Sequence, residues 1–445
     1  VNIIGSQKAT IFAQVGQFYS GSVGQYYSGA NMKQKYFNNK FQSLLTSSLL
    51  LIGSVQAAPL YVFTDLGSGT GMRSEAYSIN NSGQVVGVSW SNSSQDNPRP
   101  MLWYNGTTTD LNAADGLLGG AYGINDSGSI AGYQIDGQAS EAVIWNETTK
   151  TIFPVRNNFS SHSDAMGINN LGDIVGSSFG AQPDDPMQVP PNIMSAALWS
   201  NGVFTDLQAF QGAYFLSLAY RINDSQQVVG FSVIPTPGST NNESSLRATL
   251  WDHGAVVDLG AQGGGFLGGS INGSIAADIN NSGHIVGTSL IASGWDGPTE
   301  QRATLWVGTT IIDLGTWGGR ESASYAINDV GQIVGFSWGV GPILYENGIA
   351  INLNTLFDSA ALGTEWTLIP NDINDNGAIV GRAYNTITGQ LHAFLLTPEP
   401  VQPAEIVAVS APETYTLVLL GAVILAFNRS RRTYFRKTIH GSLHA

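Results

Sequence analysis

Cysteine is absent from this chain of 445 residues, and charged side chains make up only 11% of it. Without cysteine there are no disulfide bonds, so stability has to come from a buried core, for which the length is ample. Basic residues are scarce in the body of the chain: residues 59–396 hold 9 Lys and Arg against 29 Asp and Glu, a formal charge of −20. Because a nucleic-acid partner requires a basic surface, this acidic body argues against one.

Common catalytic and metal-binding motifs are also missing. The sequence contains no nucleophile elbow, phosphate-binding loop or dinucleotide fingerprint. Its six histidines form no pair at helical or hairpin spacing, and no calcium loop with a distal Glu is present. We therefore expect no metal and no cofactor, and an enzyme is the less favoured class of function.

Glycine, in contrast, is abundant: 54 residues, about 12% of the chain against a usual 7%, favour many tight turns over long helices. One stretch, Tyr325 to Gly335 with the sequence YAINDVGQIVG, occurs in seven versions. Intervals of 44 to 57 residues between the versions indicate a repeat architecture. The first Asn of each version stands at Asn80, Asn125, Asn169, Asn223, Asn280, Asn328 and Asn374.

Each version predicts a β-hairpin. Asn at the first position of a four-residue turn bonds back to the backbone, and Gly at the fourth position accepts a positive φ. In the copy that begins at Asn223, Gln226 takes the glycine position, and we expect a strained or altered turn there. The predicted turn glycines of the other six copies are Gly83, Gly128, Gly172, Gly283, Gly331 and Gly377.

Two further strands follow each hairpin. One ends in Leu-Trp or a variant, as at Leu305-Trp306, and the other runs into Asp-Leu, as at Asp313-Leu314. Four strands in about 45 residues match the size of a propeller blade. The chain enters at an Asp-Leu strand (about 60–66) and leaves at a Leu-Trp-type strand (about 392–396), so pairing of these two would leave no open edge. We predict an all-β fold: a seven-bladed β-propeller of four-stranded blades over residues 59–396, closed by pairing of its first and last strands.

The repeats resemble the HAF extracellular repeat. The triplet that names that family stands once, as His392-Ala393-Phe394, and the rest of its pattern appears as ATLW, DLGTWGG, SYAIN and GQIVGFS over about 335 residues. The resemblance implies an extracellular location and no established activity. The strand order also resembles a WD-repeat blade, which implies that the strand before the Asn is innermost and the Asp-Leu strand outermost.

The N-terminal region predicts a secretory signal peptide at residues 32–58. Lys33, Lys35 and Lys40 precede an apolar run from Leu44 to Ile52, and small residues lead to a cleavage site after Ala57. Met32 is then the biological start. We interpret residues 1–31 as an upstream extension that is not native, with a genuine N-terminal extension as the alternative.

The C-terminal region predicts a sorting signal. A linker (397–411) leads to residues 412–445, where Pro412-Glu413-Thr414 precedes an apolar run from Tyr415 to Phe427 that is short for a membrane helix. This order resembles the PEP-CTERM tail, which implies an exosortase-type processing enzyme as partner and membrane attachment before processing; an ordinary membrane anchor is the alternative. Thr414 departs from the family's usual second Pro. The basic cluster that completes the tail is Arg429, Arg431 and Arg432.

The long connecting segments are predicted to share one face of the ring, because short turns join strands 1 to 2 and 3 to 4 on the other face. Loops on a rigid scaffold are where binding residues usually lie. We expect these segments at 180–194, 234–245, 260–274 and 292–301. The candidate binding residues are Trp295, Asp296, Trp317, Asp184 and Asp185, of which Trp295 is the first choice because it has no obvious core position.

Other polar and aromatic positions favour a structural role. Trp90, Phe179, Trp338 and Tyr384 end the second strands, where packing between blades is favoured over sugar stacking. The cationic position of the Leu-Trp strand is expected to pair with a carboxylate of a neighbouring blade; it is Arg99, Arg247, Arg302 and His392.

Together these patterns predict an exported, cell-surface or extracellular protein that is an interaction module of the bacterial extracellular matrix, with polysaccharide or another matrix component as ligand. Two alternatives stay open. One is a polysaccharide hydrolase or lyase with acids on the long-loop rim, and the other is a structural spacer that binds nothing.

Overall fold

The computed structural model describes residues 61–399, except 70, 92–95, 147–148, 154–161, 181–192, 210–215, 236–243, 263–272, 293–298 and 358–365. The predicted upstream extension (1–31), signal peptide (32–58) and sorting tail (412–445) lie outside these residues. Within the described part, no helix is long and apolar enough to cross a membrane.

The described residues form strands of four kinds and one short 3-10 helix, η2 (Leu353–Thr355). The innermost strands are β2 (Arg73–Ile79), β6 (Leu118–Ile124), β10 (Ser163–Ile168), β14 (Ser217–Ile222), β18 (Ser274–Ile279), β22 (Glu321–Ile327) and β26 (Trp366–Ile373). The second strands are β3 (Val85–Trp90), β7 (Ile130–Asp136), β11 (Ile174–Gly180), β15 (Gln227–Pro235), β19 (His284–Ala292), β23 (Ile333–Trp338) and β27 (Ile379–Asn385). The third strands are β4 (Pro98–Tyr104), β8 (Ala139–Asn146), β12 (Ile193–Ser200), β16 (Ser244–Asp252), β20 (Thr299–Val307), β24 (Gly341–Glu346) and β28 (Leu391–Pro398). The outermost strands are β5 (Thr107–Asp110), β9 (Thr149–Ile152), β13 (Val203–Leu207), β17 (Ala255–Asp258), β21 (Thr310–Asp313), β25 (Ile349–Asn352) and β1 (Tyr61–Gly67).

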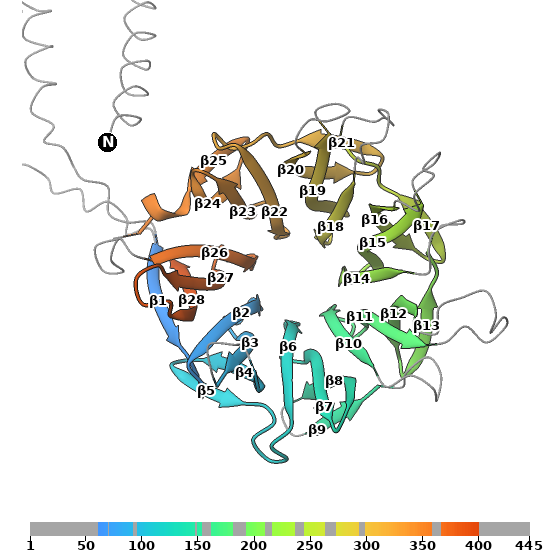
Figure 1. Cartoon of the computed structure of the whole chain (residues 1–445), viewed down its shortest axis with the longest axis vertical. Coiled ribbons are helices and arrows are strands. Elements are labelled where there is room, and N and C mark those ends of the chain that lie inside the picture. The colour runs from blue at the N-terminus through green and yellow to red at the C-terminus, as the bar shows by residue number, and fades with distance from the viewer. Residues whose placement is uncertain are drawn as a thin grey trace, which may run out of the picture. The chain divides into compact units, whose positions relative to one another are not determined.

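These strands build antiparallel four-stranded sheets that stand around a central axis (Figure 1). Five sheets are separate, and an eight-stranded sheet contains two further sets of four, which are joined only at one parallel bridge between Arg73 and Leu391. Neighbouring inner strands contact each other, and β26 contacts β2, so the ring is closed. The predicted all-β class, the four-stranded sheets and the order from innermost to outermost strand are confirmed.

The first and last strands of the ring pair as predicted. Strand β1 lies antiparallel to β28, from Tyr61 opposite Pro398 to Gly67 opposite Ala393, and the two ends of the colour scale meet there (Figure 1). The pairing extends two residues beyond Leu396, which the sequence predicted as the last residue of the body. One set of four strands therefore combines both ends of the described chain, which removes an open sheet edge.

The repeated sequence is explained by local geometry. In each inner hairpin the fourth turn residue donates its N–H to the carbonyl of the first Asn, as Gly83 does to Asn80 at 3.0 Å. Gln226 makes the same hydrogen bond to Asn223 at 3.0 Å with a φ of +58°, so this turn keeps its shape and is strained, as one of the two predicted outcomes.

The last glycine of each repeat is required by a close approach of two strands. Every inner strand carries a β-bulge, and the facing glycine of the second strand lies directly over it. A Cβ on these glycines would lie 1.9–2.2 Å from a carbonyl oxygen of the inner strand, a distance that no side chain tolerates. They are Gly87, Gly132, Gly176, Gly230, Gly287, Gly335 and Gly381.

Apolar side chains fill the spaces between neighbouring sheets. Trp145 and Val143 of β8 and Ile124 of β6 pack with Val86 of β3 in the adjacent sheet, and similar clusters recur around the ring. The closing interface is built in the same way, since Trp103 belongs to a buried cluster with residues of β27 and β28. Burial of apolar area between the sheets is thus the main source of stability.

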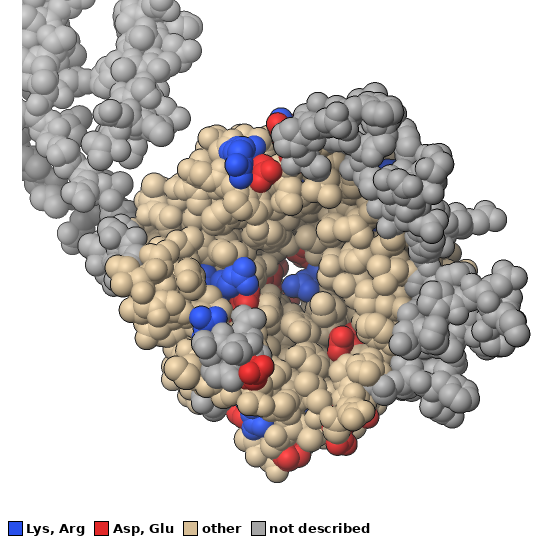
Figure 2. Space-filling view, viewed as in Figure 1, with Lys and Arg blue, Asp and Glu red and all other residues tan. Residues whose placement is uncertain are grey.

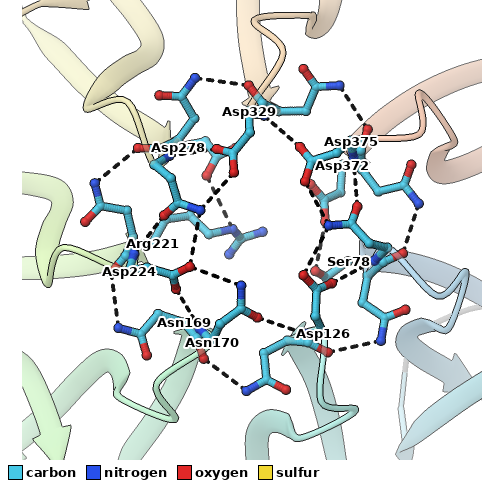
Figure 3. A pocket seen from close by; sticks show the side chains of 18 of the residues that line it. Ser78, Asp126, Asn169, Asn170, Arg221, Asp224, Asp278, Asp329, Asp372 and Asp375 are labelled. Atoms are coloured by element: carbon cyan, nitrogen blue, oxygen red, sulfur yellow. Dashed lines mark hydrogen bonds and ion pairs between the residues drawn. The ribbon is translucent and has the colours of Figure 1, made fainter.

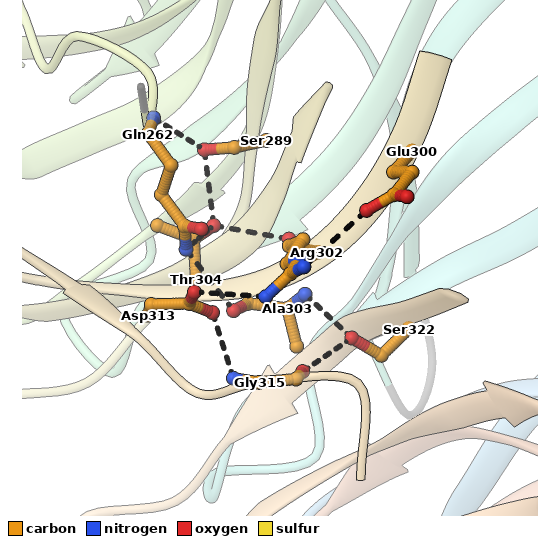
Figure 4. A network of polar contacts seen from close by, with 9 residues as sticks. All are labelled: Gln262, Ser289, Glu300, Arg302, Ala303, Thr304, Asp313, Gly315 and Ser322. Carbon is orange, nitrogen blue, oxygen red and sulfur yellow. Dashed lines mark hydrogen bonds and ion pairs between the residues drawn. The ribbon is translucent and has the colours of Figure 1, made fainter. Parts of the chain in front are cut away.

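One structural prediction, the ion pair of the cationic residue, named the wrong partner. The cationic residue of the third strand pairs with the Asp of the outermost strand in its own sheet, not with a neighbouring blade. Arg302 lies 3.3 Å from Asp313 and 3.3 Å from Glu300 (Figure 4). The Asp also accepts an N–H two residues on, as Asp313 does from Gly315, which explains the repeated Asp-Leu. The other pairs are Arg99–Asp110, Arg247–Asp258 and His392–Asp65.

Candidate functional site

The axis of the ring is surrounded at one end by the seven inner turns. Each first Asn uses its side-chain oxygen within its own turn, as Asn374 does with the N–H groups of Asn376 and Ala378. Its side-chain amide donates to the backbone carbonyl of the next Asn around the ring at 2.9–3.1 Å. Asn374 donates to Asn80, so the belt is closed.

A second belt lies directly beside the first. The second residue of each turn donates its N–H to the side-chain Oδ1 of the equivalent residue in the next turn, at 2.7–2.9 Å. Asn and Asp alternate around it, except that Asp329 is followed by Asp375 (Figure 3). The members are Asn81, Asp126, Asn170, Asp224, Asn281, Asp329 and Asp375.

The two belts enclose a pocket of about 180 Å³. Arg221 of β14 reaches into it, donates to the Met166 carbonyl at 2.9 Å, and lies 3.9 Å from Asp278 of β18 (Figure 3). Burial raises the pKa of Asp278 to about 7, and the Arg221 guanidinium offsets only part of this effect. Burial likewise raises the pKa of Asp372, which also interacts with Arg221.

Both carboxylates connect neighbouring sheets. Asp278 accepts the N–H of Ile327 at 2.8 Å, and Asp372 accepts the N–H of Ile79 at 3.0 Å and the Ser78 hydroxyl at 2.8 Å. Among the described residues, no group of three or more His, Asp or Glu is placed to hold a metal ion. At this end of the axis, Asp278 and Asp372 thus join neighbouring sheets by hydrogen bonds.

A different polar cluster lies further along the inner strands, at the interface between the last and first sets of strands. Glu75 of β2 is 4% exposed and accepts hydrogen bonds from Arg382 of β27 at 3.0 Å and from Asn371 of β26 at 2.9 Å. Arg382 keeps 38% of its side chain exposed. Basic and acidic side chains gather around the central hollow in the space-filling view (Figure 2).

A row of tyrosines continues from this cluster. The rings of Tyr77 and Tyr122 are 5.1 Å apart, and those of Tyr122 and Tyr133 are 5.6 Å apart. All three are only partly buried. Tyr77 and Tyr122 lie on the innermost strands β2 and β6, and Tyr133 lies on the second strand β7. The row ends near Asp164 of β10, whose pKa is raised by burial.

Burial also raises the pKa of the three tyrosine hydroxyls, so they stay protonated over the physiological range. For Tyr77 the neighbouring Glu75 carboxylate adds to the effect. Neutral hydroxyls on partly exposed rings offer hydrogen bonds at their tips and apolar faces for stacking.

Of the predicted binding residues, Trp317 lies among those that the structure describes. Trp317 has a φ of +55° and packs its ring 6.1 Å from that of Tyr345, so it is part of the structural packing. Trp295, Asp296, Asp184 and Asp185 lie outside the described residues. Trp90 is buried against Val88 and Leu391, as the packing interpretation predicted.

Sequence reasoning missed Glu75, Arg382 and the tyrosine row. It attributed binding to the long segments between strands, and it treated the inner hairpins as uniform scaffold. A signal was present: the position after the last glycine of the repeat is neutral in six copies and is Arg382 in the seventh. A comparison of the repeats position by position would have found it.

No protein-family model and no curated protein matches the chain. Among solved structures, the β-propeller domain of the Trilobed protease from Pyrococcus furiosus is 11% identical, with a TM-score of 0.46, and covers 74% of this chain and 95% of its own. An oligogalacturonate lyase in complex with manganese is 12% identical, with a TM-score of 0.46, and covers 77% and 94%. The assignment of a β-propeller rests on the closed ring of sheets in this chain itself.

Proposed function

We propose that this chain is an extracellular interaction module that binds polysaccharide in the central channel of a seven-bladed β-propeller. The observation that carries the proposal is the row of partly exposed tyrosines beside the Glu75, Arg382 and Asn371 cluster. Aromatic faces beside groups that donate and accept hydrogen bonds suit sugars, which have apolar ring faces and polar hydroxyl edges.

The number of blades is inferred from the inner turns. The belt of first Asn side chains has seven members and closes on itself, and the eight-stranded sheet divides into two sets of four at its single bridge. A count of seven follows if each inner hairpin belongs to one blade.

Binding is favoured over catalysis by the state of the carboxylates near the axis. Glu75 is paired with Arg382, and Asp278 and Asp372 accept backbone N–H groups of adjacent sheets. Each of these carboxylates is engaged by donors of the protein itself, which favours a structural role for it over proton exchange with a substrate. At the predicted rim, Glu300 pairs with Arg302.

Export and surface retention belong to the same proposal. The predicted signal peptide (32–58), with its cleavage site at Ala57, and the resemblance of residues 412–445 to a PEP-CTERM tail suit a protein that acts outside the cell. An exosortase-type enzyme is then the partner that processes the tail. Mass spectrometry of the mature C-terminus would test this part, and an intact tail on the surface protein would contradict it.

The binding proposal is tested with the full chain on an array of bacterial and plant polysaccharides. We expect binding to at least one polysaccharide, and we expect Tyr122→Ala to weaken it about tenfold, since stacking on an aromatic ring contributes on the order of 1 kcal/mol or more. Tyr104→Ala is the matched control, because Tyr104 is 39% exposed at the outer end of β4 and away from the axis. No binding to any polysaccharide would favour the structural spacer instead.

A further inference from the structure

One break in the sevenfold pattern lies at Arg382. The residue after the last glycine of the repeat is Arg382 in β27, while the six equivalent residues carry no charge. These are Val88, Tyr133, Ser177, Phe231, Thr288 and Phe336. At this position of the repeat, one side chain is therefore positively charged and the other six are neutral.

The geometry of Arg382 leaves part of its guanidinium available. Both hydrogen bonds to Glu75, at 3.0 and 3.2 Å, are made by Nη1. The side chain is 38% exposed while that of Glu75 is 6% exposed. Glu75 therefore holds the guanidinium through Nη1 from the buried side, and part of the Arg382 side chain stays exposed.

Two tyrosines lie near the Arg382 guanidinium. Tyr77 of β2 and Tyr325 of β22 both lie close enough to interact electrostatically with Arg382, and they come from sheets on opposite sides of it. Asn371, on β26, anchors Glu75 and the Ala76 carbonyl, and so joins the two sheets at this point. A guanidinium beside two phenol groups presents a planar fork, which suits a planar, bidentate acceptor.

We propose that Arg382 receives the carboxylate of an acidic sugar, while the tyrosine row contacts the sugar ring and its neighbours. This deepens the binding function proposed above and rests on it. The overall charge makes the proposal specific: a body with a formal charge of −20 repels polyanions in general. Binding of an acidic glycan would therefore have to come from a local arrangement such as this one.

The experiment compares polymers with one backbone and different charges: dextran, carboxymethyl-dextran, dextran sulfate and diethylaminoethyl-dextran. Dissociation constants are measured for the full chain at one fixed, physiological ionic strength. We expect carboxymethyl-dextran to bind at least about tenfold more tightly than each of the other three, because a charge-assisted bidentate hydrogen bond is strong and geometrically selective.

Variants assign the effect to the residue. Arg382→Lys keeps the charge without the planar fork and should lose most of the preference for carboxymethyl-dextran. The double variant Glu75→Gln with Arg382→Gln removes the ion pair without leaving a buried charge, so it should remain folded and lose the preference entirely. Its melting temperature is measured alongside to confirm the fold.

Each result decides between the hypotheses. Equal affinity for dextran and carboxymethyl-dextran, or an unchanged preference in the Arg382 variants, overturns the role of Arg382 and leaves polysaccharide binding standing. Equal affinity for the sulfate polymer overturns the selectivity for carboxylates, and tightest binding of the cationic polymer overturns the acidic ligand. Failure of all four polymers, together with a blank polysaccharide array, overturns the proposed function as well.

Discussion

Two regions along the axis differ in how they use the repeat. One is the turn end, where the two belts lie, and the other is the closing interface, where the last and first sets of strands meet. At the turn end, seven equivalent Asn residues make equivalent hydrogen bonds, and each belt closes on itself. At the closing interface, Asn371 and Arg382 stand at positions where the other repeats carry neither an Asn nor a charge, and Glu75 has one acidic counterpart, Asp164 of β10. The comparison teaches that repetition builds the ring, while a binding site is expected where the repeats differ.

The largest expected effect comes from cutting the belt where it closes. Asn374→Ala removes the hydrogen bonds from Asn376 and Ala378 and the bond to the Asn80 carbonyl. The buried N–H of Ala378 loses its partner, while the Asn80 carbonyl keeps the N–H of Gly83. We expect the free energy of unfolding to fall by about 2–4 kcal/mol. Urea denaturation measures it, and binding to carboxymethyl-dextran by the folded variant should be unchanged.

Asn347→Gly is the matched control for that variant. Asn347 also occupies a turn, with a φ of +51°, but this turn joins the outer strands β24 and β25. Glycine accepts this φ, so the free energy of unfolding should change by no more than about 0.5 kcal/mol. Similar losses for the two variants would mean that the belt contributes nothing beyond its own turns.

The next prediction concerns the pH dependence of stability at the turn end. Arg221→Gln leaves the carboxylates of Asp278 and Asp372 without their cation inside the belt pocket. Their pKa values are raised in the folded state, to about 7 for Asp278. Such groups make their full contribution to stability at pH values below the pKa of the unfolded state, and this contribution is lost as the pH rises through the pKa of the folded state. We therefore expect Arg221→Gln to cost more at pH 8 than at pH 5, by about 1–3 kcal/mol.

Urea denaturation at the two pH values measures this difference. Arg247→Gln is the control, since Arg247 pairs with Asp258 on the exposed outer strands at 2.8 Å. Exposed ion pairs contribute about 0–1 kcal/mol, and this loss should be nearly the same at both pH values. An equal cost of Arg221→Gln at pH 5 and pH 8 would contradict the coupling of Arg221 to the two buried carboxylates.

A smaller effect tests the one irregular turn. Gly83→Ala forces a side chain to a φ of +79° with no contact within 4 Å, so it should cost about 1 kcal/mol through backbone strain alone. Gln226→Gly relieves the same strain and loses the hydrogen bond to Asp173 at 2.7 Å. The relief of strain and the loss of the hydrogen bond oppose each other, so the free energy of unfolding should change by less than about 1 kcal/mol. Thermal unfolding compares the two, and a large loss for Gln226→Gly would show that the bond to Asp173 outweighs the strain.

Much of the scaffold could be predicted because its signals are local. A turn of Asn, two residues and Gly sets a hairpin wherever it occurs, and the orphan strand at each end of the repeats pointed to the pairing of β1 with β28. The cationic position was predicted to form ion pairs, but the partner was wrong. In the register Asp258 lies opposite Thr249, and Arg247, two residues before Thr249 on β16, reaches it at 2.8 Å within the same sheet.

The sequence alone determined the repeats, the turn chemistry and the closure, because these depend on residues that are neighbours along the chain or on a count of strands. Only the tertiary structure decided which side chains meet at the axis. Glu75 and Arg382 are 307 positions apart and touch because the ring closes between them. The Asn amides that bridge neighbouring sheets look, in sequence, like ordinary turn residues. Burial and long-range pairing arise from the closed ring, so no single repeat contains the information that specifies them.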